Sequence, residues 1–179
     1  MLSRTPGHGR YAVTEREQRW LLGELPLERR APVEITDHYL NGTCLRLRKM
    51  TSPDATIYKL GQKVRALGDS PEIVKATNIY LEEQEYSTFS SMSADQLHKT
   101  RWTWEFSGRS LAADEFHGNL EGLILAEVEL EVSEDFLTTP PSATADVTAD
   151  NRFSGGALAA LDRLKAIELL QVVNSWGRR

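Results

Sequence analysis

The stretch VTEREQRWLL (residues 13–22) carries charged side chains at three alternate positions, 15, 17 and 19. The side chains of a β-strand alternate between its two faces, so Glu15, Glu17 and Arg19 would share one face. An ordinary half-buried strand has apolar residues at this spacing. The rest of the chain decides whether this charged face lies toward solvent or toward a cavity.

Three further segments alternate charged and apolar residues in the same way. Taken singly, each is typical of a strand with a solvated outer face. Together they are sorted by sign, with carboxylates on the first and last segments and cations between them, whereas protein surfaces usually mix signs. Sorted charges favour a closed barrel with a polar interior and an apolar exterior, where Trp20, Trp102 and Trp104 would pack against helices. The charged positions are Arg46 and Arg48, Lys59 and Lys63, and Glu127, Glu129 and Glu131.

The charges of such an interior indicate which ligands it would bind. Clustered arginines and lysines attract phosphate oxygens, and arginine makes forked contacts with them. Clustered carboxylates bind a hard divalent cation, Mg²⁺ or Mn²⁺, through oxygen ligands. Without the cation, these carboxylates would repel one another and some would take up a proton. The charge pattern therefore predicts a cavity that holds a divalent cation and a polyphosphate.

Eight segments are expected to form strands, because they carry strand-like patterns separated by turn signals such as Asn41-Gly42. Strands at this spacing are typical of an antiparallel barrel or a sandwich. We predict a mainly β protein built on an eight-stranded antiparallel closed barrel. The expected strands are residues 11–22, 34–40, 43–50, 56–64, 76–81, 99–108, 110–118 and 122–132.

Helices are expected to be few. Residues 156–176 are rich in Ala and Leu at helical spacing and predict one C-terminal helix. Residues 81–92 predict a short helix or a turn-rich connection, and residues 138–156 predict an irregular excursion rich in Pro, Thr and Gly. No repeat or linker interrupts residues 11–179, which predict a single domain that follows a flexible tail at residues 1–10.

The bulk composition limits the function. Of the 179 residues, 40% are hydrophobic and 26% are charged, as in globular proteins. The net charge of −5 argues against nucleic-acid binding, and no apolar run reaches the ~20 residues that cross a bilayer. Cys44 is the only cysteine and is expected to be a packed residue. A chain with one cysteine cannot form an internal disulfide, which is typical of cytoplasmic proteins. The oligomeric state stays open, a homodimer included.

In order along the chain, these segments resemble the CYTH superfamily, the triphosphate tunnel metalloenzymes. EREQR (15–19) resembles the family's Glu-x-Glu-x-Lys signature, and the likeness extends over about residues 11–160. Each motif alone is weak, whereas the ordered set is specific. The other matching stretches are DHYLNGTCLRLRK (37–49), YKLGQK (58–63), KTRW (99–102), DEFHGNLEGLILAEVELE (114–131) and DVTADNRFSGGALA (146–159).

The resemblance implies an eight-stranded tunnel that hydrolyses a triphosphate with Mg²⁺ or Mn²⁺. The substrate would be inorganic tripolyphosphate or an organic triphosphate, such as thiamine or nucleoside triphosphate. An activated water would attack the terminal phosphorus in line, without a covalent intermediate. Glu131 is expected to lie past the tunnel, in solvent. The resemblance implies catalytic roles for Glu15, Glu17 and Arg19, metal ligation by Glu15, Glu17, Glu127 and Glu129, and substrate binding by Arg19, Arg46, Arg48, Lys59, Arg101 and Arg152.

Two positions depart from the family pattern. Arg19 replaces the signature lysine, which keeps the charge but cannot serve as an easily deprotonated base. The strand that often reads Arg-x-Glu-x-Glu is here close to TNIYL, so that Thr77, Ile79 and Leu81 are expected to occupy those places. The cavity would then lack one cation and two anions on that wall.

Two alternatives stay open for the function. One is an adenylate cyclase of the same superfamily, and the other is a non-catalytic polyphosphate-binding module. Neutralising Arg46 and Arg48 is expected to weaken phosphate binding, because two cations are lost. The fold should stay intact or become more stable, because like charges repel in an empty tunnel.

Overall fold

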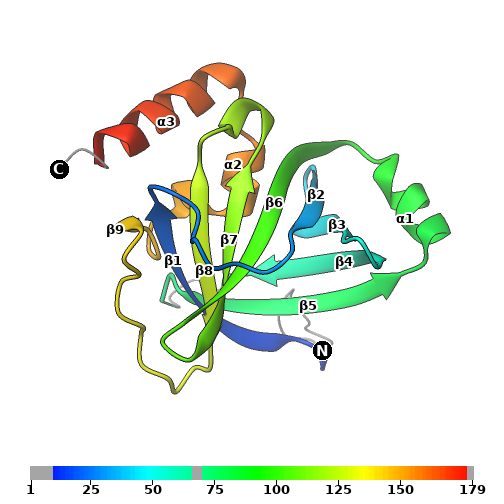
Figure 1. The fold of residues 1–179 in the computed structure, drawn as a ribbon. Coiled ribbons are helices and arrows are strands. Elements are labelled where there is room, and N and C mark those ends of the chain that lie inside the picture. The colour runs from blue at the N-terminus through cyan, green and yellow to red at the C-terminus, as the bar shows by residue number, and fades with distance from the viewer. Residues whose placement is uncertain (1–9, 66–69, 177–179) are drawn as a thin grey trace.

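The computed structural model describes residues 10–65 and 70–176, and its dominant feature is one antiparallel sheet of nine strands (Figure 1). The tail predicted for residues 1–10 lies almost wholly outside the described residues. The strands are β1 (Val13–Leu22), β2 (Val33–Leu40), β3 (Leu45–Thr51), β4 (Thr56–Val64), β5 (Ile73–Leu81), β6 (Ala94–Phe106), β7 (Arg109–Phe116), β8 (Ile124–Leu130) and β9 (Ala143–Asp146).

The sheet closes on itself through β1. Its order is β5-β4-β3-β2-β6-β7-β8-β1, and the further pairing of β1 with β5 completes a closed barrel of eight strands. β1 pairs with β5 through residues 13–16 and with β9 through residues 20–22. The predicted antiparallel barrel is confirmed, with one extra strand alongside the second half of β1.

β9 lies within the 138–156 excursion and was not predicted as a strand. It has four residues, all small or polar, and no apolar alternation that would mark it in the sequence. Its pairing with β1 places Ala145 opposite Leu21 and Asp146 opposite Trp20. A long-range partner therefore forms this strand, rather than a local preference.

The helices agree with the sequence-based prediction at α1 and differ from it near the C-terminus. α1 (Glu83–Ser90) forms within the predicted 81–92 segment and begins with a capping box between Glu82 and Glu85. The single helix predicted for residues 156–176 is wrong, because α2 (Gly155–Ala159) and α3 (Arg163–Trp176) form there instead. Asp162 starts a new helix at that point: its Oδ1 accepts a hydrogen bond from the backbone N–H of Lys165 at 2.9 Å. No helix among the described residues is long and apolar enough to cross a membrane.

The inner face of the barrel turns from charged to apolar along the strands. Leu21 continues the series of Glu15, Glu17 and Arg19 on β1, and Leu125 precedes Glu127 and Glu129 on β8. These leucines belong to a buried cluster with Phe116, Phe153 and Leu158, against which α3 packs Ala166 and Leu169. Figure 1 shows α2 and α3 beside the ends of β7 and β8. The charged part of the interior therefore borders an apolar core that these helices cover.

A second apolar cluster lies on the outer face of β1, β6, β7 and β8. Trp20 and Trp104 are buried there against Leu25, Leu137 and Ala143. Trp102 packs at its edge, with the Arg29 guanidinium 4.5 Å from its ring. The expectation of an apolar exterior is thus met on this side, but connecting segments cover it rather than helices. The segments that follow β1 and β8 bury the tryptophans, because they contribute Leu25, Leu137 and Ala143 to this cluster.

Candidate functional site

The barrel encloses a cavity of about 360 Å³ whose wall consists of alternate residues of its strands. The two carboxylates and the guanidinium of β1 point into it, so the charged face of VTEREQRWLL lies toward a cavity. The predicted residues that line it are Glu15, Glu17, Arg19, Arg46, Arg48, Lys59, Arg101, Glu127 and Glu129. Glu131 is exposed beyond the end of β8, as expected.

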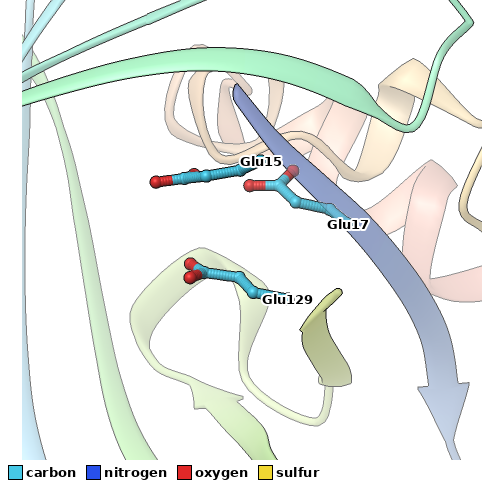
Figure 2. Close-up of side chains that lie close together, drawn as sticks. All are labelled: Glu15, Glu17 and Glu129. Carbon is cyan, nitrogen blue, oxygen red and sulfur yellow. The ribbon is translucent and has the colours of Figure 1, made fainter. Parts of the chain in front are cut away.

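Three carboxylates converge on one side of this cavity (Figure 2). Glu15 and Glu17 extend from β1, and the strand register places Glu129 of β8 opposite Glu17. One oxygen from each lies within 4.8 Å of the others. Burial and the neighbouring Glu15 carboxylate raise the pKa of Glu129. This carboxylate cluster, meaning Glu15, Glu17 and Glu129, offers the oxygen donors that Mg²⁺ and Mn²⁺ prefer.

Glu127 lines the same cavity but stands outside the carboxylate cluster. Burial opposes its ionisation, yet the cations of Lys63 and Arg101 outweigh burial and hold the pKa of Glu127 below its usual value. Its role as a metal ligand stays a prediction.

Two cations of β4 and its extension neutralise the carboxylate cluster. The Nζ of Lys63 lies 2.9 Å from Glu15 Oε2 and 2.5 Å from Glu17 Oε1. Arg65 approaches the other oxygen of Glu17 at 3.2 Å. The sequence pattern grouped Lys63 with Lys59 on one strand face and did not single out Arg65. Glu129 has no ion-pair partner within the described part of the chain.

The arginines predicted from CLRLRKM form the opposite, cationic part of the wall. Arg48 makes a forked contact with Asp37, with nitrogen–oxygen distances of 2.5 and 2.6 Å, and the carboxylate is fully buried. Arg46 Nε stands 3.6 Å from the same carboxylate. Burial alone would raise the pKa of Asp37, but the charge and hydrogen bonds of Arg48 lower it to about 2. Asp37 therefore orients both arginines toward the cavity.

A second buried carboxylate, Asp114, plays the same part for β6. Arg101 donates two hydrogen bonds to it, at 2.7 and 2.8 Å, and Lys99 donates a third at 2.5 Å. Burial lowers the pKa of Lys99 to about 8, despite the opposing charge of Asp114. Sequence reasoning missed Asp37 and Lys99, although each stands two positions from a residue of the same face, Tyr39 and Arg101 respectively.

Lys59 is the cation of this wall without a carboxylate contact among the described residues. It lies opposite Arg48 in the β3–β4 register. Burial and the neighbouring charges of Arg48 and Arg46 lower the pKa of Lys59 to about 8. An ammonium surrounded by like charge is poised to accept an anion.

The pKa of Lys59 predicts how triphosphate binding depends on pH. An anion binds the protonated amine, so affinity should be full below pH 8 and decline above it as Lys59 loses its proton. Binding at pH 8 should take up roughly half a proton at this residue. Calorimetry of tripolyphosphate binding in buffers of different ionisation enthalpy measures this uptake.

Lys59→Met should lower this proton uptake by the share of Lys59, and Lys99 can still contribute because its pKa is also about 8. Lys49→Met is the matched control, since Lys49 lies on β3 outside the cavity lining. If Lys59→Met keeps the proton uptake of the wild type, the assignment to Lys59 is wrong.

Arg19 ties β1 to the segment that enters α2. Its Nη1 donates to the carbonyl of Phe153 at 3.0 Å, and its Nη2 lies 4.0 Å from Glu17. The cavity is then bordered by Gly155, where a Cβ would lie 1.9 Å from the hydroxyl of Tyr39. A side chain at this position would force Tyr39 to move, so glycine permits the close approach of α2 to β2 at the border of the cavity.

The structure does not support the predicted contact of Arg152 with substrate. Its side chain is 54% exposed, lies outside the cavity, and contacts Asp150 at 2.6 Å. The reason is local, because Asn151–Phe153 forms a 3₁₀ turn in which Asp150 caps the backbone N–H of Arg152 and pairs with its guanidinium. Arg152 therefore does not belong to the tunnel wall.

The expected orientation of β5, with Thr77, Ile79 and Leu81 facing the cavity, is wrong. Asn78 lies opposite Gly61 and lines the cavity, so its neighbours Thr77 and Ile79 point outward, and Leu81 shares their face. The inner face of β5 is nevertheless uncharged, as the sequence suggested, but it is formed by Val74, Ala76 and Asn78.

The turn between β2 and β3 borders the cavity through Thr43, Cys44 and Leu45. Cys44 is exposed, so its prediction as a packed residue is wrong. It lies just before β3 begins at Leu45, where the chain has not yet joined the sheet.

Comparisons with known proteins support the architecture. No family model and no curated protein matches the sequence. The structure is similar to that of the inorganic triphosphatase NE1496, with a TM-score of 0.56 and 25% sequence identity, over 84% of this chain and 97% of that chain. A second structure of NE1496 gives a TM-score of 0.55 and 24% identity, over 82% of this chain and 98% of that chain.

A more distant likeness concerns the fold alone. The PH1819 protein from Pyrococcus horikoshii OT3 matches with a TM-score of 0.52 and 14% identity, over 91% of this chain and 90% of that chain. The closed eight-stranded barrel, its charged interior and the likeness to NE1496 agree with the motifs read from the sequence, and the chain has the fold of the CYTH superfamily.

Proposed function

We propose that this protein is a metal-dependent phosphohydrolase that cleaves a triphosphate inside the barrel. The observation that carries the proposal is the division of one cavity into the carboxylate cluster and a wall of arginines and lysines. The likeness to the inorganic triphosphatase NE1496 supports the same reaction and makes inorganic tripolyphosphate the first substrate to test. Organic triphosphates come second.

The residues present fit the divalent cation that this reaction needs. Glu15, Glu17 and Glu129 would hold Mg²⁺ or Mn²⁺ through their converging oxygens, and Glu127 would add a ligand at the edge. When bound, the cation would neutralise phosphate charge and lower the pKa of a coordinated water. No lone carboxylate would serve, because a hard cation takes several oxygen ligands.

The cationic wall would bind and orient the triphosphate. Arg46, Arg48 and Arg101 are held by buried carboxylates, so their guanidiniums are fixed before substrate arrives, and fixed charges stabilise a transition state without reorganising. Lys59 would add an unpaired charge. Arg19 would stabilise negative charge near the carboxylates rather than act as a base, because its guanidinium keeps its proton.

The test is release of phosphate from tripolyphosphate, followed with malachite green, in the presence of Mg²⁺ or Mn²⁺. We expect turnover with either metal and none with EDTA. Cyclic AMP formed from ATP, detected by mass spectrometry, would instead support a cyclase. The absence of phosphate release from every triphosphate under both metals would overturn the hydrolase proposal.

The uncharged inner face of β5 favours one second candidate, a module that binds polyphosphate without cleaving it. This candidate predicts tight tripolyphosphate binding by calorimetry with no turnover. In either case the proposed partner is a small phosphorylated molecule in the cytoplasm rather than a nucleic acid, in keeping with the net charge of −5.

A further inference from the structure

The ammonium of Lys63 occupies the carboxylate cluster itself. Its Nζ contacts Glu15 at 2.9 Å and Glu17 at 2.5 Å, and the Glu17 side chain is only 5% exposed. These are the oxygens that the proposed function assigns to a divalent cation. An ammonium and a metal ion compete for these oxygens, since like charges repel at close range.

The route by which Lys63 reaches these carboxylates is built into the barrel. β4 and β1 are not neighbours, because β5 lies between them. Lys63 is opposite Ala76, and Ala76 is opposite Val13. Ala76 is buried and small, so the lysine side chain can cross β5 above it. The uncharged inner face of β5 thus lets a cation of β4 pair with the carboxylates of β1.

We infer that Lys63 is an internal counter-ion of the carboxylate cluster, which a divalent cation displaces and the triphosphate then accepts. This inference rests on the proposed function. Lys63 lines the same cavity as Lys59 and Arg46, so a displaced ammonium moves toward other cations when no anion is bound. With triphosphate present, it gains phosphate oxygens instead. Metal and triphosphate therefore bind with positive coupling, and the metal alone binds weakly.

The inference distinguishes Lys63 from Lys59, which provides a matched control. Both are lysines on the inner face of β4, and replacing either by methionine removes one positive charge from the same cavity. Of these two lysines, Lys63 alone contacts the carboxylate cluster in the described part of the chain. A general electrostatic effect would appear in both variants, whereas the release of the carboxylates would appear in Lys63→Met alone.

The experiment measures binding of Mn²⁺ alone by calorimetry to the wild type, Lys63→Met and Lys59→Met. We expect Lys63→Met to bind Mn²⁺ at least about tenfold tighter than the wild type, and Lys59→Met less than about threefold tighter. Binding of the Mg²⁺ complex of imidotriphosphate, whose bridging N–H groups resist hydrolysis, should weaken about fivefold in Lys63→Met, because one phosphate contact is lost. Opposite signs of the two changes are the signature of a transferred counter-ion.

Lys63→Gln repeats the comparison with an uncharged side chain that keeps a hydrogen-bond donor, in case the methionine variant does not fold. Equal gains in Mn²⁺ affinity for the Lys63 and Lys59 variants would overturn the inference and leave the proposed function standing. Failure of every Lys63 variant to bind Mn²⁺ would overturn both the inference and the metal site. The expected binding pattern without hydrolysis of any triphosphate would instead contradict the proposed function alone.

Discussion

Glu17→Gln should lower the turnover of tripolyphosphate by at least about a hundredfold, which corresponds to roughly 2.7 kcal/mol of transition-state stabilisation. Glu17 is the most buried member of the carboxylate cluster. Glutamine has nearly the same shape, and its oxygen can still accept a hydrogen bond from Lys63, so the change removes charge rather than packing. Without that charge, the cluster would hold a divalent cation less tightly. The measurement is steady-state phosphate release at saturating Mg²⁺ or Mn²⁺, together with calorimetry of Mn²⁺ binding.

Glu131→Gln is the matched control for this prediction. Glu131 belongs to the same Glu-x-Glu series of β8 but lies exposed past the end of the strand. Its replacement should leave turnover within about twofold of the wild type, as for a surface charge. Equal turnover in Glu17→Gln and Glu131→Gln would remove the carboxylate cluster from the reaction.

Arg48→Ala should lower the free energy of unfolding by about 3–5 kcal/mol, because it leaves a buried carboxylate without its partner. The sequence pattern alone predicts the opposite, a fold that is unchanged or more stable when the clustered arginines are neutralised. The difference arises from Asp37, which is fully buried and makes a forked contact with Arg48. The melting temperature should fall by on the order of 10 °C, as measured by calorimetry or circular dichroism.

Arg46→Ala and the pH dependence control this second prediction. Arg46 stands 3.6 Å from Asp37 without the forked geometry, so Arg46→Ala should destabilise the fold much less. Arg48 holds the pKa of Asp37 at about 2, below the ordinary 3.8, so the pair stabilises the native state above pH 4 and loses this effect as the pH falls toward 2. The difference between Arg48→Ala and the wild type should therefore shrink below pH 4. A difference that does not vary with pH, or an equal loss in Arg46→Ala, would argue against the buried pair.

Local sequence patterns determined the barrel and most of its charged wall. The period of two in VTEREQRWLL places Glu15, Glu17 and Arg19 on one face whatever the strand pairs with, because alternation is a property of the extended backbone. The same reasoning held for Arg46 and Arg48 on β3. Sorting of these faces by sign then favoured an internal cavity over a solvated surface, and the ordered motifs resemble those of the CYTH superfamily.

Which charges meet depends on the long-range pairing of the strands. Lys63 and Glu17 are brought together across Ala76 when β5 joins β1, and Asp37 meets Arg48 through the β2–β3 register. Strand register and barrel closure are set by the whole sheet, since a shift of one residue exchanges the two faces of a strand. That is why the outward direction of Thr77 and Ile79 could not be read from the local pattern. Alternation specifies that two faces differ, whereas long-range pairing specifies which face is inside and which side chain lies across from it.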